Sequence, residues 1–218
     1  MSYTPIVPAL IPDSAQAVKD AAESFHFAKE FHLDVIDGIF VPKKSWPYEP
    51  LGDPMEVKPW LDSYTLEVDL MVADPAAAAE AWIKAGADML VFHVETIPLQ
   101  TFEQFVEDCP ASVGVSCHGD THMETLMQYL KHADYVQLMG IAQIGSQGQP
   151  FDESVFDKIA HVQSECPGMS ITIDGSVNQD TIAHLAKAGA DRFITGSAVA
   201  GADSPKHAYA ELQALINV

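Results

Sequence analysis

Residues 75–95 read PAAAAEAWIKAGADMLVFHVE, and they decide the fold class because they hold one complete unit of helix followed by strand. Pro75 suits the first turn of a helix, and Gly86 suits the left-handed residue that follows the last turn. The apolar run Met89–Glu95 then predicts a buried strand. The tetrapeptide Ala-Gly-Ala-Asp inside this stretch returns at 188–191, again between an expected helix and an expected strand.

The same alternation of apolar runs and amphipathic stretches continues along the whole chain. We expect strands at Pro5–Ile11, His32–Ile36, Leu66–Val72, Met89–Glu95, Ser112–Cys117, Tyr135–Gly140, Met169–Asp174 and Arg192–Thr195. We expect helices near 14–30, 53–61, 75–86, 100–108, 121–131, 152–164, 178–188 and 204–216. Eight strand–helix pairs favour an α/β fold of the (β/α)8 TIM-barrel type, with residues 1–218 as one domain. An open, doubly wound sheet is the alternative.

Composition limits the classes of protein and partner. Hydrophobic residues make up 48% of the 218 residues, enough for a full core. The net charge of −20 disfavours binding to nucleic acid or to an anionic membrane. No run of about 18 apolar residues predicts a membrane span, and the first residues lack the pattern of a secretory signal. We therefore expect a cytoplasmic protein whose three cysteines (Cys109, Cys117 and Cys166) are reduced thiols.

Polar residues interrupt the apolar strands at alternate positions. In the third strand Glu67 and Asp69 share a face opposite the apolar one, and in the second strand His32 and Asp34 do the same. These faces point into a barrel, near the carboxyl ends where barrel enzymes build their sites. With Asp174 from the seventh strand, His32, Asp34 and Asp69 could hold one divalent cation. Spacing alone leaves a hydrogen-bonded core histidine as the alternative reading.

Seven short motifs follow one another over nearly the whole chain. They are His32–Pro42 (HLDVIDGIFVP), Asp69–Val72 (DLMV), His93–Glu95 (HVE), Gly145–Phe151 (GSQGQPF), Asp174–Val177 (DGSV), Ala188–Asp191 (AGAD) and Gly196–Ala198 (GSA). Together and in this order they resemble the motifs of the ribulose-phosphate 3-epimerase family. The DGSV segment is also similar to the allulose-6-phosphate 3-epimerase branch. The resemblance implies a barrel of the ribulose-phosphate-binding type.

The resemblance also implies a mechanism. Asp34 and Asp174 would be the catalytic acid and base that invert C3 of a ketose phosphate, D-ribulose 5-phosphate, D-xylulose 5-phosphate or a close relative, through an enediolate. One divalent ion (Zn, Mn or Fe) would be held by His32, Asp34, Asp69 and Asp174. Other implied site residues are Met71, Met139 and His93 near the site, and Gly148, Gly175, Ser176, Gly196 and Ser197 at the phosphate. The partner would be a small sugar phosphate, and the chain would form a homo-oligomer.

Several departures from the family pattern fall at the expected site. Asp69 stands where the family has a histidine ligand, and Ala9 stands where it has a serine that contacts substrate. Lys43 replaces an asparagine, and Glu67 faces inward without a family role. A divergent relative that binds another phosphorylated ligand, with altered or no epimerase activity, is therefore the alternative function. The Asp-x-Lys-x-x-Asp motif of related decarboxylases and hexulose-phosphate synthases does not occur in the chain.

Overall fold

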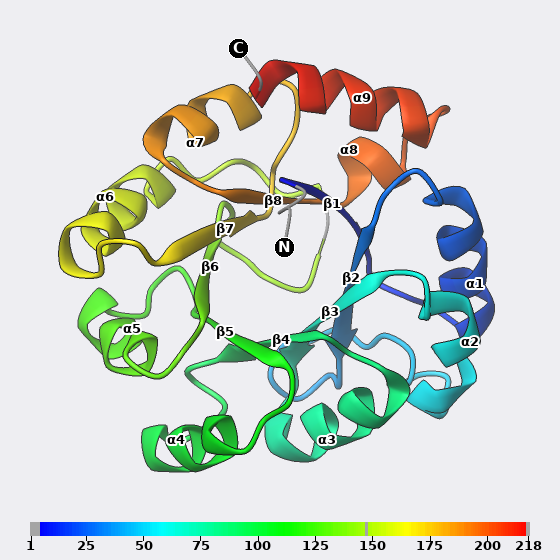
Figure 1. Cartoon of the computed structure of the whole chain (residues 1–218), viewed down its shortest axis with the longest axis horizontal. Coiled ribbons are helices and arrows are strands. Elements are labelled where there is room, and N and C mark those ends of the chain that lie inside the picture. The colour runs from blue at the N-terminus through cyan, green and yellow to red at the C-terminus, as the bar shows by residue number, and fades with distance from the viewer. Residues whose placement is uncertain (1–4, 147, 217–218) are drawn as a thin grey trace.

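The computed structural model describes residues 5–146 and 148–216, and in it eight parallel strands close into a barrel in the order of the chain. Figure 1 shows the strands as an inner ring with the helices outside it. The strands are β1 (Ile6–Leu10), β2 (Glu30–Ile36), β3 (Thr65–Met71), β4 (Met89–His93), β5 (Ser112–Ser116), β6 (Tyr135–Met139), β7 (Ser170–Asp174) and β8 (Arg192–Thr195). The expectation of a (β/α)8 barrel is confirmed, and the open sheet is wrong because β8 pairs with β1.

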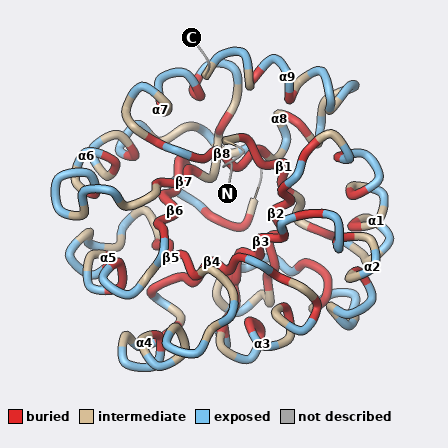
Figure 2. The backbone as a smooth tube through the Cα atoms, viewed as in Figure 1, coloured by how far each residue is buried: buried red, intermediate tan, exposed pale blue. Residues whose placement is uncertain are grey.

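Helices follow the strands around the ring. They are α1 (Ala15–Ser24), the 3-10 helix η1 (Pro54–Glu56), α2 (Lys58–Leu61), α3 (Pro75–Ala85), α4 (Leu99–Glu107), α5 (Met123–Leu130), α6 (Val155–Glu165), α7 (Ile182–Ala188), α8 (Ser197–Ala200) and α9 (Pro205–Ile216). None of the helices within the described ranges is both long and apolar enough to cross a membrane. Burial is concentrated on the strands and on the helix faces turned toward them (Figure 2).

Several expected boundaries were wrong: α7 begins at Ile182 and not near residue 178, and the helix expected near 53–61 is divided into η1 and α2. The first helix ends at Ser24 and not near residue 30, because Phe25 turns out of the helix and packs its ring against Phe31 at 5.5 Å. The second strand consequently begins at Glu30, two residues earlier than expected. The short helix α8 was not expected, since four residues carry too little periodicity to be recognised.

The unit quoted from residues 75–95 forms as its sequence predicts. Pro75 occupies the first turn of α3, where its missing N–H costs nothing, and the Asp74 side chain caps that end by accepting from the backbone N–H of Ala77. Gly86 ends α3 at φ 105°, and Gly189 ends α7 at φ 102°. Both conformations are left-handed and favour glycine. The repeated tetrapeptide is therefore a helix end joined directly to the next strand.

The two faces of each strand pack against different surroundings. Outward residues such as Leu33, Val68 and Phe92 belong to the large apolar core between strands and helices. Inward residues form smaller clusters, with Met89, Val91 and Tyr135 toward the amino ends and Ile36, Met71 and Met139 toward the carboxyl ends. Between these two apolar layers lies a polar layer, which is the candidate site.

Candidate functional site

Four side chains from three strands meet inside the barrel. They are His32 and Asp34 from β2, Asp69 from β3 and Asp174 from β7, and each offers one ligand atom within 4.8 Å of the others. Asp34 lies directly beside Asp69 in the β2–β3 register, which brings those two carboxylates together. The structure thus gathers the same four residues that the sequence suggested as metal ligands.

The carboxylate of Glu67 orients the imidazole ring of His32. Its Nδ1 lies 2.6 Å from Oε2 of Glu67, while its Nε2 lies 3.3 Å from Oδ1 of Asp34. The Glu67 contact turns Nε2 toward the cluster, as carboxylates commonly do for metal-bound histidines. Burial by itself would lower the pKa of His32, but the carboxylates of Glu67 and Asp34 raise it well above its ordinary value.

Glu67 is the functional residue that sequence reasoning left without a role. It is fully buried and accepts hydrogen bonds from the Tyr135 hydroxyl at 2.7 Å and from Nη1 of Arg192 at 2.7 Å. Arg192 also donates from Nε to Glu30 at 2.8 Å. Burial alone would raise the pKa of Glu67, but the positive charges of Arg192 and His32 bring it down to about 2. The sequence contained one signal for this role, because Glu67 faces inward in β3 and an arginine that can pair with it, Arg192, faces inward in β8.

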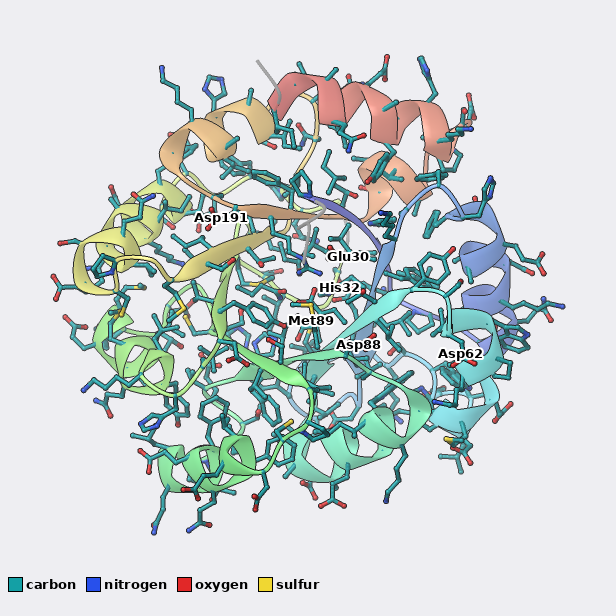
Figure 3. The ribbon with its side chains drawn as sticks, in the orientation of Figure 1. Glu30, His32, Asp62, Asp88, Met89 and Asp191 are labelled. Carbon is teal, nitrogen blue, oxygen red and sulfur yellow. The ribbon has the colours of Figure 1, made fainter. Side chains whose placement is uncertain are left out.

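Figure 3 shows Glu30 and His32 inside the ring of strands, whereas Asp62 lies in the outer layer of helices. The barrel interior therefore holds a stack of charged groups that begins with Glu30 and Arg192 near the amino ends of the strands. It continues through Glu67 to His32 and the carboxylates. Glu30, Arg192, Glu67, His32 and Asp34 each contact a group that can carry the opposite charge, which offsets the cost of burying them.

Asp69 has both of its oxygens engaged. Oδ1 lies 2.8 Å from Nε2 of His93, and Oδ2 accepts from Nε2 of Gln137 at 2.8 Å. All three side chains are fully buried. His93 was expected near the site and lies behind Asp69, while Gln137 was not expected there. A carboxylate oxygen has two acceptor positions, so these contacts leave Asp69 able to bind a cation as well.

The negative charge of Asp34 acts on the carboxyl group of Asp174. Burial, followed by the charge of Asp34, raises the pKa of Asp174 to about 8. Burial also raises the pKa of Asp34, although the hydrogen bond with His32 opposes part of that effect. Without a cation between them, one of the two carboxyls therefore holds a proton more readily than an exposed aspartate does.

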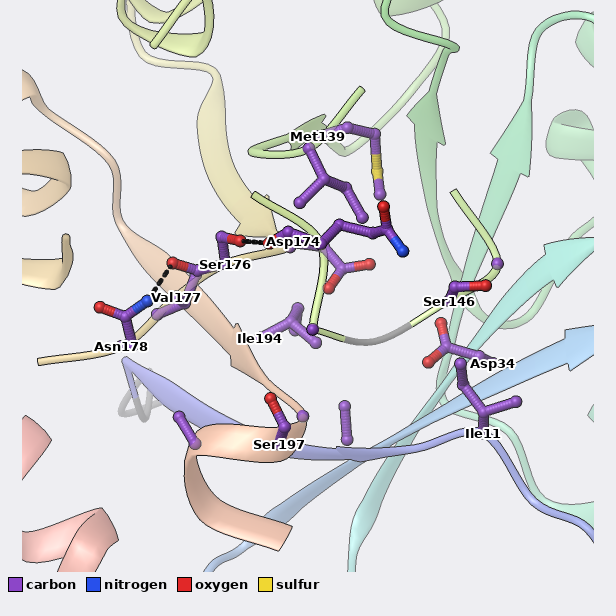
Figure 4. A pocket seen from close by; sticks show the side chains of 18 of the residues that line it. Ile11, Asp34, Met139, Ser146, Asp174, Ser176, Val177, Asn178, Ile194 and Ser197 are labelled. Carbon is purple, nitrogen blue, oxygen red and sulfur yellow. Dashed lines mark hydrogen bonds between the residues drawn. The ribbon is translucent and has the colours of Figure 1, made fainter. Parts of the chain in front are cut away.

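A cavity of about 340 Å³ opens directly above this cluster. Asp34 and Asp174 line it, and Figure 4 shows their carboxyl groups turned toward one another. Met71 and Met139 also line it, as expected for residues near the site, together with Ala9 in the first strand. The cavity is large enough for a small sugar phosphate but falls short of most drug-sized pockets.

The five expected phosphate-binding residues all line the same cavity. Gly175, Ser176, Gly196 and Ser197 follow β7 and β8, and Gly148 lies in the loop after β6. Ser176 adopts a left-handed φ of 53°, which is uncommon for a residue with a side chain. Its hydroxyl donates to the backbone oxygen of Gln149 and so ties the loop after β7 to the loop after β6.

The cavity wall also holds residues that were not expected from the sequence, Ser146 and Asn178 among them. Ser146 lies in the loop after β6 and Asn178 in the loop after β7 (Figure 4). Asn178 donates to the Ser176 oxygen at 3.1 Å and accepts from the N–H of Asp180 at 2.9 Å, so it stabilises its own loop. Loop residues of this kind carry no periodicity, and only the folded chain brings them to the cavity.

The donor set of the cluster suits a divalent cation. One imidazole nitrogen and three carboxylates are a combination that zinc, manganese and iron accept. The hydrogen bonds of His32 to Glu67, and of Asp69 to His93 and Gln137, are the outer support that metal ligands usually have. Among the described residues this is the group of four that could hold a metal ion.

A closed parallel barrel with carboxylates in a cavity at the carboxyl ends of its strands defines a (β/α)8-barrel enzyme. The model of the ribulose-phosphate 3-epimerase family matches residues 5–200. The chain belongs to this family, whose members are carbohydrate epimerases and hence isomerases.

Curated relatives agree with the family model. The ribulose-phosphate 3-epimerase of Mycobacterium tuberculosis (strain ATCC 25618 / H37Rv) is 31% identical over 215 residues, which cover 95% of this chain and 91% of the relative. The enzyme of the same name from Bacillus subtilis (strain 168) is 33% identical over 190 residues, covering 84% of each chain. Each alignment covers most of this chain and most of the relative.

Solved structures with low sequence identity show the same fold. The 3-keto-L-gulonate-6-phosphate decarboxylase from Vibrio cholerae O1 biovar El Tor has a TM-score of 0.74 at 16% identity, covering 99% of this chain and 98% of its own. The 3-hexulose-6-phosphate synthase from Salmonella typhimurium has a TM-score of 0.74 at 14% identity, covering 98% and 99%. At these identities the likeness concerns the barrel alone.

Proposed function

We propose that the chain catalyses metal-dependent epimerisation at C3 of a ketose phosphate, with Asp34 and Asp174 as its acid/base pair. The observation that carries the proposal is that these two carboxyls, from β2 and β7, line one cavity and belong to one cluster of potential metal ligands. Two proton-transfer groups facing one pocket from different strands can act on opposite faces of a carbon atom.

In the proposed reaction one aspartate removes the proton from C3, and the other returns a proton to the opposite face. The electron pair left by the first transfer is held as an enediolate until the second transfer, so no oxidant or reductant is needed. A divalent ion held by His32, Asp34, Asp69 and Asp174 would supply positive charge beside the developing negative oxygen. Met71 and Met139 would keep water from the reacting carbon because they cover the cluster with apolar surface.

The phosphate of the substrate would lie at the loops after β6, β7 and β8. Among the described residues of the cavity wall there is no lysine or arginine, so neutral donors must bind the anion. The hydroxyl of Ser197 and the backbone N–H groups beside Gly175 and Gly196 offer such donors, and these glycines allow a close approach of the backbone. The ketose phosphates with five or six carbons remain the proposed substrate class, with D-ribulose 5-phosphate and D-xylulose 5-phosphate first.

Exchange of the C3 proton in deuterated water tests the proposal directly. Several ketose phosphates are incubated with the enzyme, and deuterium at C3 is followed by NMR. We expect exchange in the wild-type enzyme and a loss of at least about 100-fold in Asp34→Asn and Asp174→Asn. Asp62→Asn, an exposed carboxylate of the outer layer, serves as the matched control. Full exchange in both site variants would remove the two aspartates from catalysis.

A second candidate function is supported by the departures at the site. Ala9 places a methyl group on the cavity wall where a hydroxyl would contact substrate, and Asp69 brings a third carboxylate to the cluster. A relative with altered chemistry could then bind another phosphorylated ligand without epimerising it. Binding of ketose phosphates without C3 exchange in the metal-loaded enzyme would favour this alternative.

We also propose that the chain acts in the cytoplasm on small molecules, as a homo-oligomer and without nucleic acid or membrane as a partner. The relative from Oryza sativa subsp. japonica named as a cytoplasmic isoform, 28% identical over 181 residues, supports the location. The acidic charge of −20 supports the absence of nucleic acid. Light scattering of the purified chain measures the assembly.

A further inference from the structure

Asp69 is a ligand candidate whose two carboxylate oxygens are each held by a neighbouring side chain. Its neighbour on one side is His93 at the end of β4, and on the other is Gln137 in the middle of β6. Each donates to a different oxygen of the carboxylate at 2.8 Å. A carboxylate held at both oxygens from two strands has little freedom to rotate about its last torsion angle.

Each of the two donors also carries a buried polar atom that has no hydrogen-bond partner among the described residues. Within the part of the chain that the structure describes, Nδ1 of His93 and Oε1 of Gln137 are both buried without a partner. Burying a polar atom unpaired costs free energy, so a purely structural residue is expected to have both ends satisfied. The only side-chain hydrogen bond of His93 among the described residues is the one to Asp69, and Gln137 adds to its bond with Asp69 only a long contact of Nε2 with Sδ of Met139 at 4.0 Å. The opposite orientation of the Gln137 amide would place two oxygens against each other, so the amide N–H must face the carboxylate.

The surrounding side chains exclude water from the hydrogen bonds of Asp69 with His93 and Gln137. His93 and Gln137 are fully buried, and the ring of Phe40, from the loop after β2, packs on His93 with the centroids 5.1 Å apart. Neither donor lines the cavity, so neither can touch a substrate there. Their effect on the reaction must pass through Asp69.

We propose that His93 and Gln137 are positioning residues that hold the Asp69 carboxylate in place as a ligand of the metal centre. The inference rests on the proposed function, since it assigns a purpose to the cluster as a cation site. Without the two bonds, Asp69 would turn freely and lose affinity for the ion. Outer hydrogen bonds of this kind typically contribute about 10- to 100-fold to metal affinity.

Matched variants separate the hydrogen bond from the bulk of the side chain. His93→Met and Gln137→Met keep length and apolar volume but remove the donor. His93→Gln removes the ring but retains an amide N–H that can reach Asp69. Ser116→Ala is the control, because Ser116 pairs with His93 in the β4–β5 register and is fully buried, and its hydroxyl has no partner in the structure.

The measurement is the affinity of the metal-free protein for Mn²⁺, followed by EPR of the free ion, with circular dichroism of the metal-free protein as the test of folding. We expect each methionine variant to bind Mn²⁺ about 10-fold or more weakly than wild type, His93→Gln to stay within about threefold, and Ser116→Ala to be unchanged. Methionine variants that bind as tightly as wild type would overturn the proposal. So would a His93→Gln variant as weak as His93→Met, because the N–H donor would then not be the cause.

Failure of this inference can be told apart from failure of the proposed function. If wild type binds Mn²⁺ and exchanges the C3 proton while the methionine variants bind normally, only the positioning roles are wrong. If wild type binds neither Mn²⁺, Zn²⁺ nor Fe²⁺, both the metal centre and the positioning roles are wrong. If a methionine variant fails to fold, the comparison of His93→Gln with wild type still decides, since the proposal requires that variant to retain its affinity.

Discussion

At the scale of single residues, a buried charge in the barrel interior is stabilised by neighbouring groups of opposite charge or by hydrogen-bond donors. Glu67 shows this most clearly, because its two oxygens serve His32, Tyr135 and Arg192 at once. Sequence alone indicates that Glu67 faces inward, but its partners come from strands far away in the chain. The role of this residue, support for a histidine of the candidate site, follows from the tertiary structure.

Replacing Glu67 by glutamine tests that support. In Glu67→Gln the buried guanidinium of Arg192 keeps Glu30 but loses one carboxylate, so we expect a decrease in the free energy of unfolding of about 3 kcal/mol. Urea unfolding measures it. Glu49→Gln removes an exposed partner of Lys44 and should cost under about 1 kcal/mol. Equal stabilities of the two variants would contradict a structural dependence on the Glu67 charge.

Cys117 gives a second prediction at this scale. Burial raises the pKa of its thiol to about 12. At pH 8 a thiol of pKa about 9 is roughly one-tenth thiolate, whereas one of pKa about 12 is thiolate in roughly one molecule in 10,000. We therefore expect Cys117 to resist a thiol reagent such as DTNB in the native protein at pH 8 and to react once urea unfolds the chain. The thiol that reacts only after unfolding should be missing in a Cys117→Ala variant, which assigns it to Cys117. A fast reaction of Cys117 in the folded protein would contradict its burial.

At the scale of elements, short signals in the sequence determine where helices end. Gly86 and Gly189 end α3 and α7 in the left-handed conformation, as the repeated tetrapeptide predicts. The end of the first helix was not expected at Ser24 because no glycine or proline follows it; Phe25, the next residue, packs its ring against Phe31 of β2. Local chemistry is visible in a sequence, whereas packing between distant rings is not.

Substitution at Gly86 tests the importance of the left-handed helix end. With φ at 105° and only the flexible end of Lys58 near an added Cβ, the cost of Gly86→Ala is set by the backbone, and we expect a loss of about 1–2 kcal/mol. Gly86→Asn should lose less, because asparagine visits this conformation more readily. Urea unfolding of both variants provides the measurement. An alanine variant as stable as wild type would show that the backbone can leave this conformation freely.

At the scale of the whole molecule, the cluster joins β2, β3 and β7 across the barrel. A cation bound there would stabilise the folded state over the unfolded chain, because unfolding separates the ligands. We expect Mn²⁺ at about 100 times its dissociation constant to raise the free energy of unfolding by about 2.7 kcal/mol, and a chelator to reverse the change.

Thermal unfolding with Mn²⁺ or with EDTA measures this effect. Asp174→Asn serves as the control, since losing one carboxylate of the cluster should remove most of the stabilisation while the barrel still forms. An unfolding temperature that does not respond to any of Mn²⁺, Zn²⁺ and Fe²⁺ would contradict a metal centre in the cluster. Measuring Asp174→Asn in the C3 exchange assay as well tests whether the carboxylate that binds the metal is also needed for the proposed proton transfer.

The sequence by itself determined the barrel and predicted which polar residues of the strands face its interior. Strand periodicity of two and helix periodicity of 3.6 are local properties, so they can be read along the chain, and alternation within β2, β3 and β7 assigned His32, Asp34, Asp69 and Asp174 to the interior. Only the tertiary structure decided which residues support these four side chains. Glu67, His93, Gln137 and Arg192 reach the cluster or its supports from separate strands. Their contacts depend on the register between strands and on closure of the ring, which are set by the folding of the whole chain and not by any local stretch of it.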